Sequence, residues 1–141
     1  IVKRLEPIAR AKNVSINYNR VREVIAEVEE TKLSLAVSNL IENAIKYNVD
    51  DGKIDVSVDC DHQNAFITVA DTGIGIAEDE IGKIFDRFYR VDKNRDRETG
   101  GTGLGLSITR SAVLMHNGSI KVSSKENEGT TFVITIPLKQ K

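Results

Sequence analysis

Cysteine, charge of one sign and long apolar runs are all scarce in this sequence of 141 residues, and each scarcity excludes a class of protein. The single cysteine, Cys60, cannot form an internal disulfide or a zinc cluster, which fits a reducing compartment such as the cytosol. No apolar run approaches the ~20 residues that a membrane-spanning helix needs, and no signal peptide is recognisable. The formal net charge is −1, so no overall field draws the chain to nucleic acid or to an anionic membrane. Any phosphate that it binds must therefore be held by local geometry.

What is present is the composition of one soluble globular domain. Apolar residues make up 40% and charged residues 29% of the chain. The length suits a single domain, residues 1–141, with one hydrophobic core. The chain begins at Ile1, inside a helical pattern, so we expect it to be a fragment of a longer protein. The lack of a membrane segment then says nothing about the parent protein.

Hydrophobic periodicity predicts an α+β fold. Helical spacing of apolar residues predicts helices over residues 1–12, 31–47, 78–84 and 104–116. Alternation predicts strands over residues 14–19, 22–28, 54–60, 65–71, 119–123 and 130–138. These elements predict a two-layer α/β sandwich, in which the helices pack on one face of a mixed sheet. Residues 92–101 are polar and charged and predict a mobile loop.

The helix expected over residues 31–47 has an unusual polar side. Asn39, Asn43 and Lys46 stand at i, i+4 and i+7, so they form one stripe beside the apolar one. Asparagine inside a helix costs roughly 0.5 kcal/mol relative to alanine. The stripe therefore indicates a task such as binding a hard cation through amide oxygens. A plain solvated helix face explains the same spacing equally well.

The segment Asp71-Thr-Gly73-Ile-Gly75 follows a strand. Asp71 shares strand parity with Ile67 and Val69, so its carboxylate is predicted to point toward the buried side. A buried carboxylate needs hydrogen-bond donors, and an adenine amino group is one candidate. The two glycines would let the backbone approach a flat ligand closely. A turn with a capping aspartate remains the alternative.

A glycine-rich segment, residues 100–106, opens the helix expected after it. Backbone N–H groups exposed before a helix N-terminus bind phosphate oxygens, with help from the helix dipole. The pattern lacks the Gly-Lys-Ser/Thr of a P-loop. It also has Leu106 where a dinucleotide fingerprint needs its third glycine. A flexible linker is the remaining alternative.

Taken in order, these segments resemble the catalytic ATP-binding domain of bacterial sensor histidine kinases. Asn39–Tyr47 resembles the N-box, Asp71–Gly75 the first glycine box and Phe85–Arg90 the F-box. Gly101–Gly105 looks like the second glycine box, and Gly129–Phe132 is similar to the last segment of the family. The resemblance covers essentially the whole chain.

The resemblance implies a fold shared with DNA gyrase and certain chaperones, with ATP bound between helices and a flexible lid at about residues 85–103. It implies that the domain transfers the γ-phosphoryl group of Mg²⁺·ATP to a histidine on a separate dimerisation hairpin. From there the group would pass to the receiver domain of a response regulator. We therefore expect a cytoplasmic domain of a bacterial inner-membrane protein, without direct membrane or nucleic-acid contact. The fragment alone would be a monomer, because the family dimerises through the hairpin.

The resemblance also implies roles for matching residues. Asn43 would coordinate Mg²⁺ with support from Asn39, and Asp71 would receive the adenine amino group. The implied catalytic residues are Asn43, Lys46 and Arg90, the last neutralising charge on the γ-phosphate. The implied nucleotide-binding residues are Asn39, Asn43, Lys46, Tyr47, Asp71, Gly73, Gly75, Ile76, Tyr89, Arg90, Gly101, Thr102, Gly103, Leu104, Gly105, Leu106 and Thr131. Thr131 would reach the adenine end of the site through water.

One position favours phosphoryl transfer over hydrolysis. Four residues before the metal-binding asparagine, hydrolytic relatives have a glutamate that activates water, and Asn39 cannot accept a proton. Glu42 lies about 100° around the helix from Asn43 and does not replace it. A protein serine kinase of the anti-sigma type is an alternative within enzymes. A nucleotide-sensing module without transfer is the alternative outside them.

Neither histidine of the chain is expected to accept phosphate. His62 is predicted to lie in an exposed hairpin turn and His116 in the last turn of a helix, where its role is structural. Met115 is expected to continue a buried apolar face with Leu104, Ile108 and Ala112. Cys60 is expected to be an inward strand residue without special reactivity.

Overall fold

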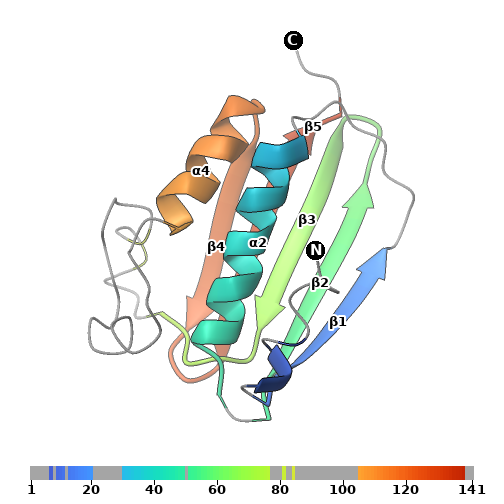
Figure 1. Cartoon of the computed structure of the whole chain (residues 1–141). Coiled ribbons are helices and arrows are strands. Elements are labelled where there is room, and N and C mark those ends of the chain that lie inside the picture. Colours follow the sequence, from blue (N-terminus) through green and yellow to red (C-terminus); the bar gives the residue numbers. More distant parts are fainter. Residues whose placement is uncertain are drawn as a thin grey trace.

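The computed structural model describes residues 7, 9–11, 13–20, 30–49, 51–76, 81, 84 and 105–138. Residues 9–11 are helical. The elements that follow are β1 (Ser15–Arg20), α2 (Glu30–Lys46), β2 (Lys53–Cys60), β3 (Asn64–Asp71), α4 (Gly105–Met115), β4 (Ser119–Lys125) and β5 (Gly129–Pro137). Figure 1 shows α2 and α4 lying side by side across the sheet.

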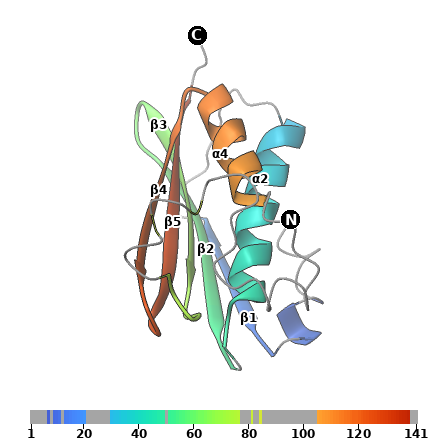
Figure 2. The ribbon, with the colours of Figure 1, turned by 90° about the vertical axis from the view of Figure 1, so that its left-hand side faces the viewer.

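The five strands form one sheet in the order β1-β2-β3-β5-β4. β1 and β2 are parallel and the other neighbours are antiparallel, so the sheet is mixed. Both helices cover the same face of this sheet, and Figure 2 shows the resulting two layers edge-on. The predicted two-layer α+β sandwich is therefore confirmed.

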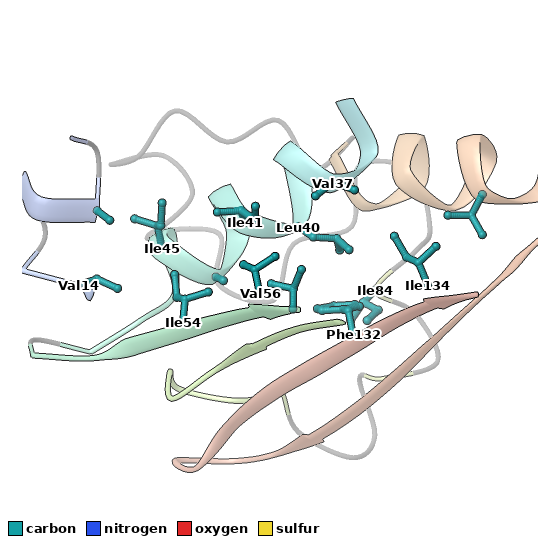
Figure 3. Packing of buried hydrophobic residues seen from close by; sticks show 14 of the residues in the cluster. Val14, Val37, Leu40, Ile41, Ile45, Ile54, Val56, Ile84, Phe132 and Ile134 are labelled. Carbon is teal, nitrogen blue, oxygen red and sulfur yellow. The ribbon is translucent and has the colours of Figure 1, made fainter. Parts of the chain in front are cut away.

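Strict alternation along β5 explains which face of the sheet the helices cover. Phe132, Ile134 and Ile136 are buried, and the residues between them are half-buried. Phe132 pairs with Val69 of β3, and Ile134 pairs with Ile67. These side chains belong to the hydrophobic core or pack against it, and Figure 3 shows Phe132 and Ile134 between the sheet and the helix layer. The core thus lies between the inner face of the sheet and the helix layer.

The apolar stripe of α2 is the one that periodicity predicts. Leu40, Ile41 and Ile45 are almost completely buried against the sheet. The helix already includes Glu30, one residue before the predicted start. The predicted end near Tyr47 agrees with the observed last residue, Lys46.

The predicted buried face of α4 is wrong at two residues. Ile108 is 41% exposed and Met115 46% exposed, whereas Thr109, Val113 and His116 are almost completely buried. The helix turns this second stripe inward because both polar members find partners there. Thr109 Oγ1 donates to the carbonyl of Ala36 on α2 at 3.2 Å.

Other predicted elements agree with the structure or lie outside the described residues. Four predicted strands correspond to β1, β2, β3 and β5, and the predicted strand over residues 119–123 extends to Lys125 in β4. The strand predicted over residues 22–28 and the lid predicted at about 85–103 lie outside the described residues, as does most of the helix predicted over 78–84. Among the described residues, no helix combines the length and hydrophobicity needed to cross a membrane.

Candidate functional site

A pocket lies between the C-terminal half of α2, the loop after β3 and the start of β5. It is lined by Asn43, Ala44, Tyr47, Asp71, Ile74, Gly75, Ile76, Ile84, Leu106, Thr130 and Phe132. Three segments that the sequence singled out for a nucleotide site thus meet at one place. Phe132 and Ile84, which Figure 3 labels next to each other, join this pocket to the hydrophobic core.

Asp71 is the one carboxylate among the described residues that line the pocket. It ends β3 on the same face as Val69, as its parity predicts, and it is half-buried. Its Oδ1 accepts hydrogen bonds from the backbone N–H of Gly73 at 2.8 Å and of Thr130 at 3.3 Å. Within the described part of the chain, Oδ2 accepts no hydrogen bond, so it remains able to accept one from a ligand.

Burial raises the pKa of Asp71 above its usual value, and the N–H groups of Gly73 and Thr130 oppose this shift only in part. A pKa raised by desolvation means that the charged carboxylate lacks donors that water would supply. A ligand N–H group placed at Oδ2 would compensate for that loss. The electrostatics therefore favour a ligand that donates a hydrogen bond here.

The loop that follows Asp71 is held from both sides of the pocket. On the α2 side, the N–H of Ile74 donates to the carbonyl of Tyr47 at 3.0 Å. On the opposite side, the carbonyl of Ile74 accepts from the N–H of Asn127 at 2.7 Å, and the N–H of Ile76 donates to Ser124 Oγ at 2.7 Å. The loop is therefore a bridge between α2 and the β4–β5 turn.

Gly73 and Gly75 are required by this bridge. A Cβ at Gly73 would lie 2.5 Å from the carbonyl oxygen of Tyr47. A Cβ at Gly75, whose φ is +72°, would lie 2.1 Å from the carbonyl oxygen of Lys125. The two glycines allow the protein backbone to pack against itself. Their expected approach to a flat ligand stays a prediction, although Gly75 does line the pocket.

The polar stripe of α2 reaches the pocket at its C-terminal end. Asn43 lines the pocket and is half-buried, and its side chain makes no hydrogen bond within the described part of the chain. Lys46 Nζ lies 5.1 Å from the centroid of the Tyr47 ring, a cation–π geometry that holds the two side chains together. Asn39, one turn earlier, is half-buried and is not among the described residues that line the pocket.

Thr130, next to the predicted site residue Thr131, is among the residues that line the pocket. Thr130 is buried on the pocket face together with Phe132, whereas Thr131 pairs with Ala70 and Ser123 on the opposite face of the sheet. Thr130 therefore lines the pocket and Thr131 does not, and the role of Thr131 through water stays a prediction. The alternation of Phe132, Ile134 and Ile136 already carried this signal, because it assigns Thr130 to the inner face.

Sequence reasoning also missed Asn48 and Ser124. Asn48 is buried at the end of α2, where its Oδ1 accepts from the N–H of Val49 at 2.8 Å and its Nδ2 donates to the carbonyl of Lys53 at 3.2 Å. Its Oδ1 also accepts from Thr72 Oγ1 at 3.3 Å. Thr72 lies 24 residues away in the sequence, so no local pattern signals this contact.

Several predicted site residues lie outside the described part of the chain. These are Tyr89, Arg90, Gly101, Thr102, Gly103 and Leu104. Gly105 begins α4, and Leu106 in its first turn lines the pocket, as expected for the end of the glycine-rich segment.

The two histidines are where the sequence places them. His62 is exposed in the β2–β3 turn. His116 is buried just after α4, and its Nδ1 lies 2.7 Å from the carbonyl oxygen of Ala112. The structural role expected for His116 is confirmed.

Comparison with known proteins identifies relatives for most of the chain. Residues 28–140 match the family described as histidine kinase-, DNA gyrase B-, and HSP90-like ATPase. The sensor histidine kinase RppB of Synechocystis is 48% identical over 116 residues, which are 82% of this chain and 26% of the relative. The sensor histidine kinase WalK of Bacillus subtilis is 42% identical over 121 residues, 84% of this chain and 20% of the relative. The chain thus spans about a quarter or less of these proteins.

Solved structures agree. The catalytic domain of histidine kinase ThkA is 29% identical, with a TM-score of 0.83 over 97% of this chain and 88% of that one. Full-length ShkA in complex with AMPPNP is 25% identical, with a TM-score of 0.83 over 99% of this chain and 28% of that one. ThkA in complex with the response regulator protein TrrA is 27% identical, with a TM-score of 0.77 over 96% of this chain and 37% of that one.

Proposed function

The chain belongs to the histidine kinase-, DNA gyrase B-, and HSP90-like ATPase family, and we propose that it binds Mg²⁺·ATP and passes the γ-phosphoryl group to a histidine of a two-component signalling protein. The acceptor lies on a dimerisation hairpin outside this chain. The bond from the γ-phosphorus to the β–γ bridging oxygen breaks, a bond from phosphorus to an imidazole nitrogen forms, and ADP leaves. Positioning and charge neutralisation carry such a reaction.

The geometry of Asp71 is the observation that carries the adenine part of the proposal. Its Oδ1 is held by two backbone N–H groups, whereas its Oδ2 has no partner among the described residues, and the residue lines an apolar pocket. The amino group of adenine donates to that oxygen. Guanine has a carbonyl oxygen at the same ring position, and a second acceptor there leaves the carboxylate unpaired.

The α2 side of the pocket supports the phosphate part of the proposal. Lys46 carries a positive charge close to Tyr47, at the end of the helix that lines the pocket. These two side chains contact phosphate or ribose. Arg90 and the backbone of residues 101–105 contact the phosphates in the arrangement that the family resemblance implies.

The side chain of Asn43 fits the Mg²⁺ ion of the proposal. Within the described residues, no group of three or more His, Cys, Asp or Glu side chains could hold a metal. A single amide oxygen suits a cation that takes its other ligands from phosphates and water. When bound, the ion neutralises charge on the phosphates, and Asn43 fixes its position, with Asn39 supporting it.

The α2 sequence favours transfer over hydrolysis. Asn39 cannot accept a proton from water, and Glu42, which is exposed, points away from Asn43 around the helix. The γ-phosphoryl group therefore persists until a histidine is presented. The receiver domain of a response regulator then takes it, a partner that the ThkA–TrrA complex illustrates for a relative. The domain is a cytoplasmic part of a membrane-anchored parent protein, and it is a monomer when the hairpin is absent.

Calorimetric titration with AMPPNP, with and without Mg²⁺, tests the binding site. We expect Asp71→Asn to weaken binding at least tenfold, about the effect of one lost hydrogen bond to a charged group. Asn43→Asp should change the dependence on Mg²⁺. Asp55→Asn is the matched control, because Asp55 is exposed on the open face of the same sheet. Equal binding by wild type and Asp71→Asn would contradict the adenine site.

Transfer is tested in the full-length parent protein with ATP labelled at the γ-phosphorus. We expect label that is stable in base and lost in acid, as phosphohistidine is. Acid-stable label would indicate a serine kinase. Binding without any labelled protein would indicate the nucleotide-sensing module.

A further inference from the structure

Ser124 and Thr130 form a pair at the edge of the pocket, next to Asp71. They stand directly opposite each other in the β4–β5 ladder, and their hydroxyl oxygens are 2.7 Å apart. Thr130 lines the pocket, and its backbone N–H donates to Asp71 Oδ1 at 3.3 Å. The hydroxyl of Thr130 is therefore near the position where a base would meet Asp71.

The partners of Ser124 determine where its single proton goes. The carbonyl oxygen of Gly129, 3.0 Å away, can only accept a hydrogen bond, so Ser124 donates to it. The backbone N–H of Ile76, at 2.7 Å, can only donate and occupies one lone pair of Ser124 Oγ. One lone pair of Ser124 remains, and the hydroxyl of Thr130 is the group in contact with it.

The hydroxyl of Thr130 therefore donates its proton to Ser124. In the opposite assignment, Ser124 would donate its proton to Thr130. Two acceptor oxygens, Ser124 Oγ and the Gly129 carbonyl, would then face each other at 3.0 Å without a proton between them. With its proton engaged, Thr130 Oγ1 has only lone pairs left for the pocket. Because Asp71 and Thr130 both line the pocket, a base bound there would meet two acceptor groups, the Asp71 carboxylate and Thr130 Oγ1.

We propose that Ser124 is a positioning residue for purine selectivity, which acts by holding the Thr130 hydroxyl as an acceptor toward the base. The inference rests on the proposed function, because it assumes that a purine occupies the pocket. A 6-amino purine supplies two N–H donors to two acceptors, directly or through water. A 6-oxo purine places an acceptor there, and the Thr130 hydroxyl cannot donate to it while its proton is engaged by Ser124.

The test compares the affinities of AMPPNP and its guanine counterpart, GMPPNP, by calorimetry on the complete chain. In Ser124→Ala, the Thr130 hydroxyl is released and is able to donate to a 6-oxo group. We expect the ratio of the GMPPNP to the AMPPNP dissociation constant to fall about tenfold, as for one hydrogen bond gained by the wrong base. If Ser124 had a purely structural role, Ser124→Ala would weaken the binding of both nucleotides equally. An unchanged ratio would therefore overturn the proposal.

Two control variants separate the proposed role of Ser124 from a general effect of substitution in β4. Ser123→Ala makes the same chemical change one residue away, on the exposed face, and should leave the ratio unchanged. Ser124→Thr keeps the hydroxyl and should retain the wild-type ratio. A fall of similar size in Ser123→Ala would mean that the ratio reports general loosening, which would also overturn the proposal.

A double-mutant cycle with Thr130→Val tests whether Ser124 acts through Thr130. Thr130→Val removes the hydroxyl and nearly preserves its shape, so Ser124→Ala should have no further effect on the ratio in that background. A further fall would contradict the relay. If Ser124→Ala does not fold, Thr130→Val alone still tests whether the ratio depends on the Thr130 hydroxyl. Thr130→Val with the full wild-type ratio would also overturn the proposal. Failure of wild type to bind AMPPNP would instead refute the proposed function itself.

Discussion

Oδ1 of Asn48 accepts a hydrogen bond from Thr72 Oγ1 at 3.3 Å, so the end of α2 is tied to the loop that carries Asp71. The same amide group also bonds to Val49 and Lys53. A Cβ at Gly52 would lie 2.0 Å from Asn48 Oδ1, which shows how closely the turn before β2 encloses this side chain. The position of Asp71 beside the pocket thus depends on a buried amide that is not among the described residues lining the pocket.

Asn48→Ala should destabilise the domain. The N–H of Val49 loses its acceptor in a partly buried place, and we expect the free energy of unfolding to fall by about 2 kcal/mol. Urea denaturation measures it. Asn17→Ala is the control, because exposed Asn17 makes only a 3.4 Å contact with Asp55. A loss at Asn48 no larger than at Asn17 would contradict this role.

Gly75→Ala should destabilise the fold and weaken binding at the proposed nucleotide site. The new Cβ would require a strained φ of +72° and would collide with the carbonyl of Lys125, at a cost of about 1–3 kcal/mol. Thermal unfolding and AMPPNP titration measure the two effects.

Asn127→Gly provides the contrast for Gly75. Asn127 also has a positive φ, 65°, and glycine adopts that conformation without strain. Stability should therefore stay within about 0.5 kcal/mol of wild type. Equal losses for the two variants would show that the left-handed backbone is not the cause.

The pH dependence of stability should differ in sign between Asp71 and Asp61. Burial raises the pKa of Asp71 in the folded state above the ordinary value of 3.8. The folded state then holds its proton more tightly, so this residue lowers stability as pH rises from about 3.8 through its folded pKa. Asp71→Asn should therefore be more stable than wild type near neutral pH, and this advantage should vanish in acid.

Asp61 should behave in the opposite way. Backbone N–H groups of Asn64 and Gln63 lower the pKa of Asp61 below 3.8. Its contribution to stability is present above that value and is lost as pH falls through the folded pKa. Asp61→Asn should be less stable than wild type at neutral pH and equal to it in strong acid. Denaturation curves from pH 2 to 8 compare the variants, and parallel pH profiles would refute the assignment.

The inward face of α4 is tested by truncation. Val113 is completely buried, and Val113→Ala should reduce the free energy of unfolding by about 2 kcal/mol. Met115 is 46% exposed, so Met115→Ala should stay within about 0.5 kcal/mol of wild type. A larger loss of stability for Met115→Ala than for Val113→Ala would mean that the buried face of α4 is the one predicted from hydrophobic spacing.

The layers and strands could be predicted from the sequence because each follows from a local period. The face of α4 could not, because two stripes compete there and the inward one contains Thr109 and His116. Both residues are accommodated by backbone carbonyls, of Ala36 and Ala112, that a hydropathy pattern does not register. The tertiary hydrogen bond of Thr109 and the local contact of His116 thus outweighed side-chain hydrophobicity in this helix.

The candidate site was predictable where chemistry is unusual for its surroundings. Asp71 is a charged residue at the end of an apolar strand, and Asn43 is a poor helix former inside a helix, so both stand out from their neighbours. Ser124 and Asn48 are ordinary polar residues in the sequence, and only the contacts with Ile76 and Thr72 reveal what they do.

The strand order also sets when the pocket forms as the chain is synthesised. β5 is the last described strand in the sequence, yet it lies inside the sheet between β3 and β4. Until residue 130 has left the ribosome, Asp71 lacks its Thr130 partner and β4 has no neighbour in the sheet. A nascent chain therefore acquires the complete surroundings of Asp71 only after β5 has inserted between β3 and β4.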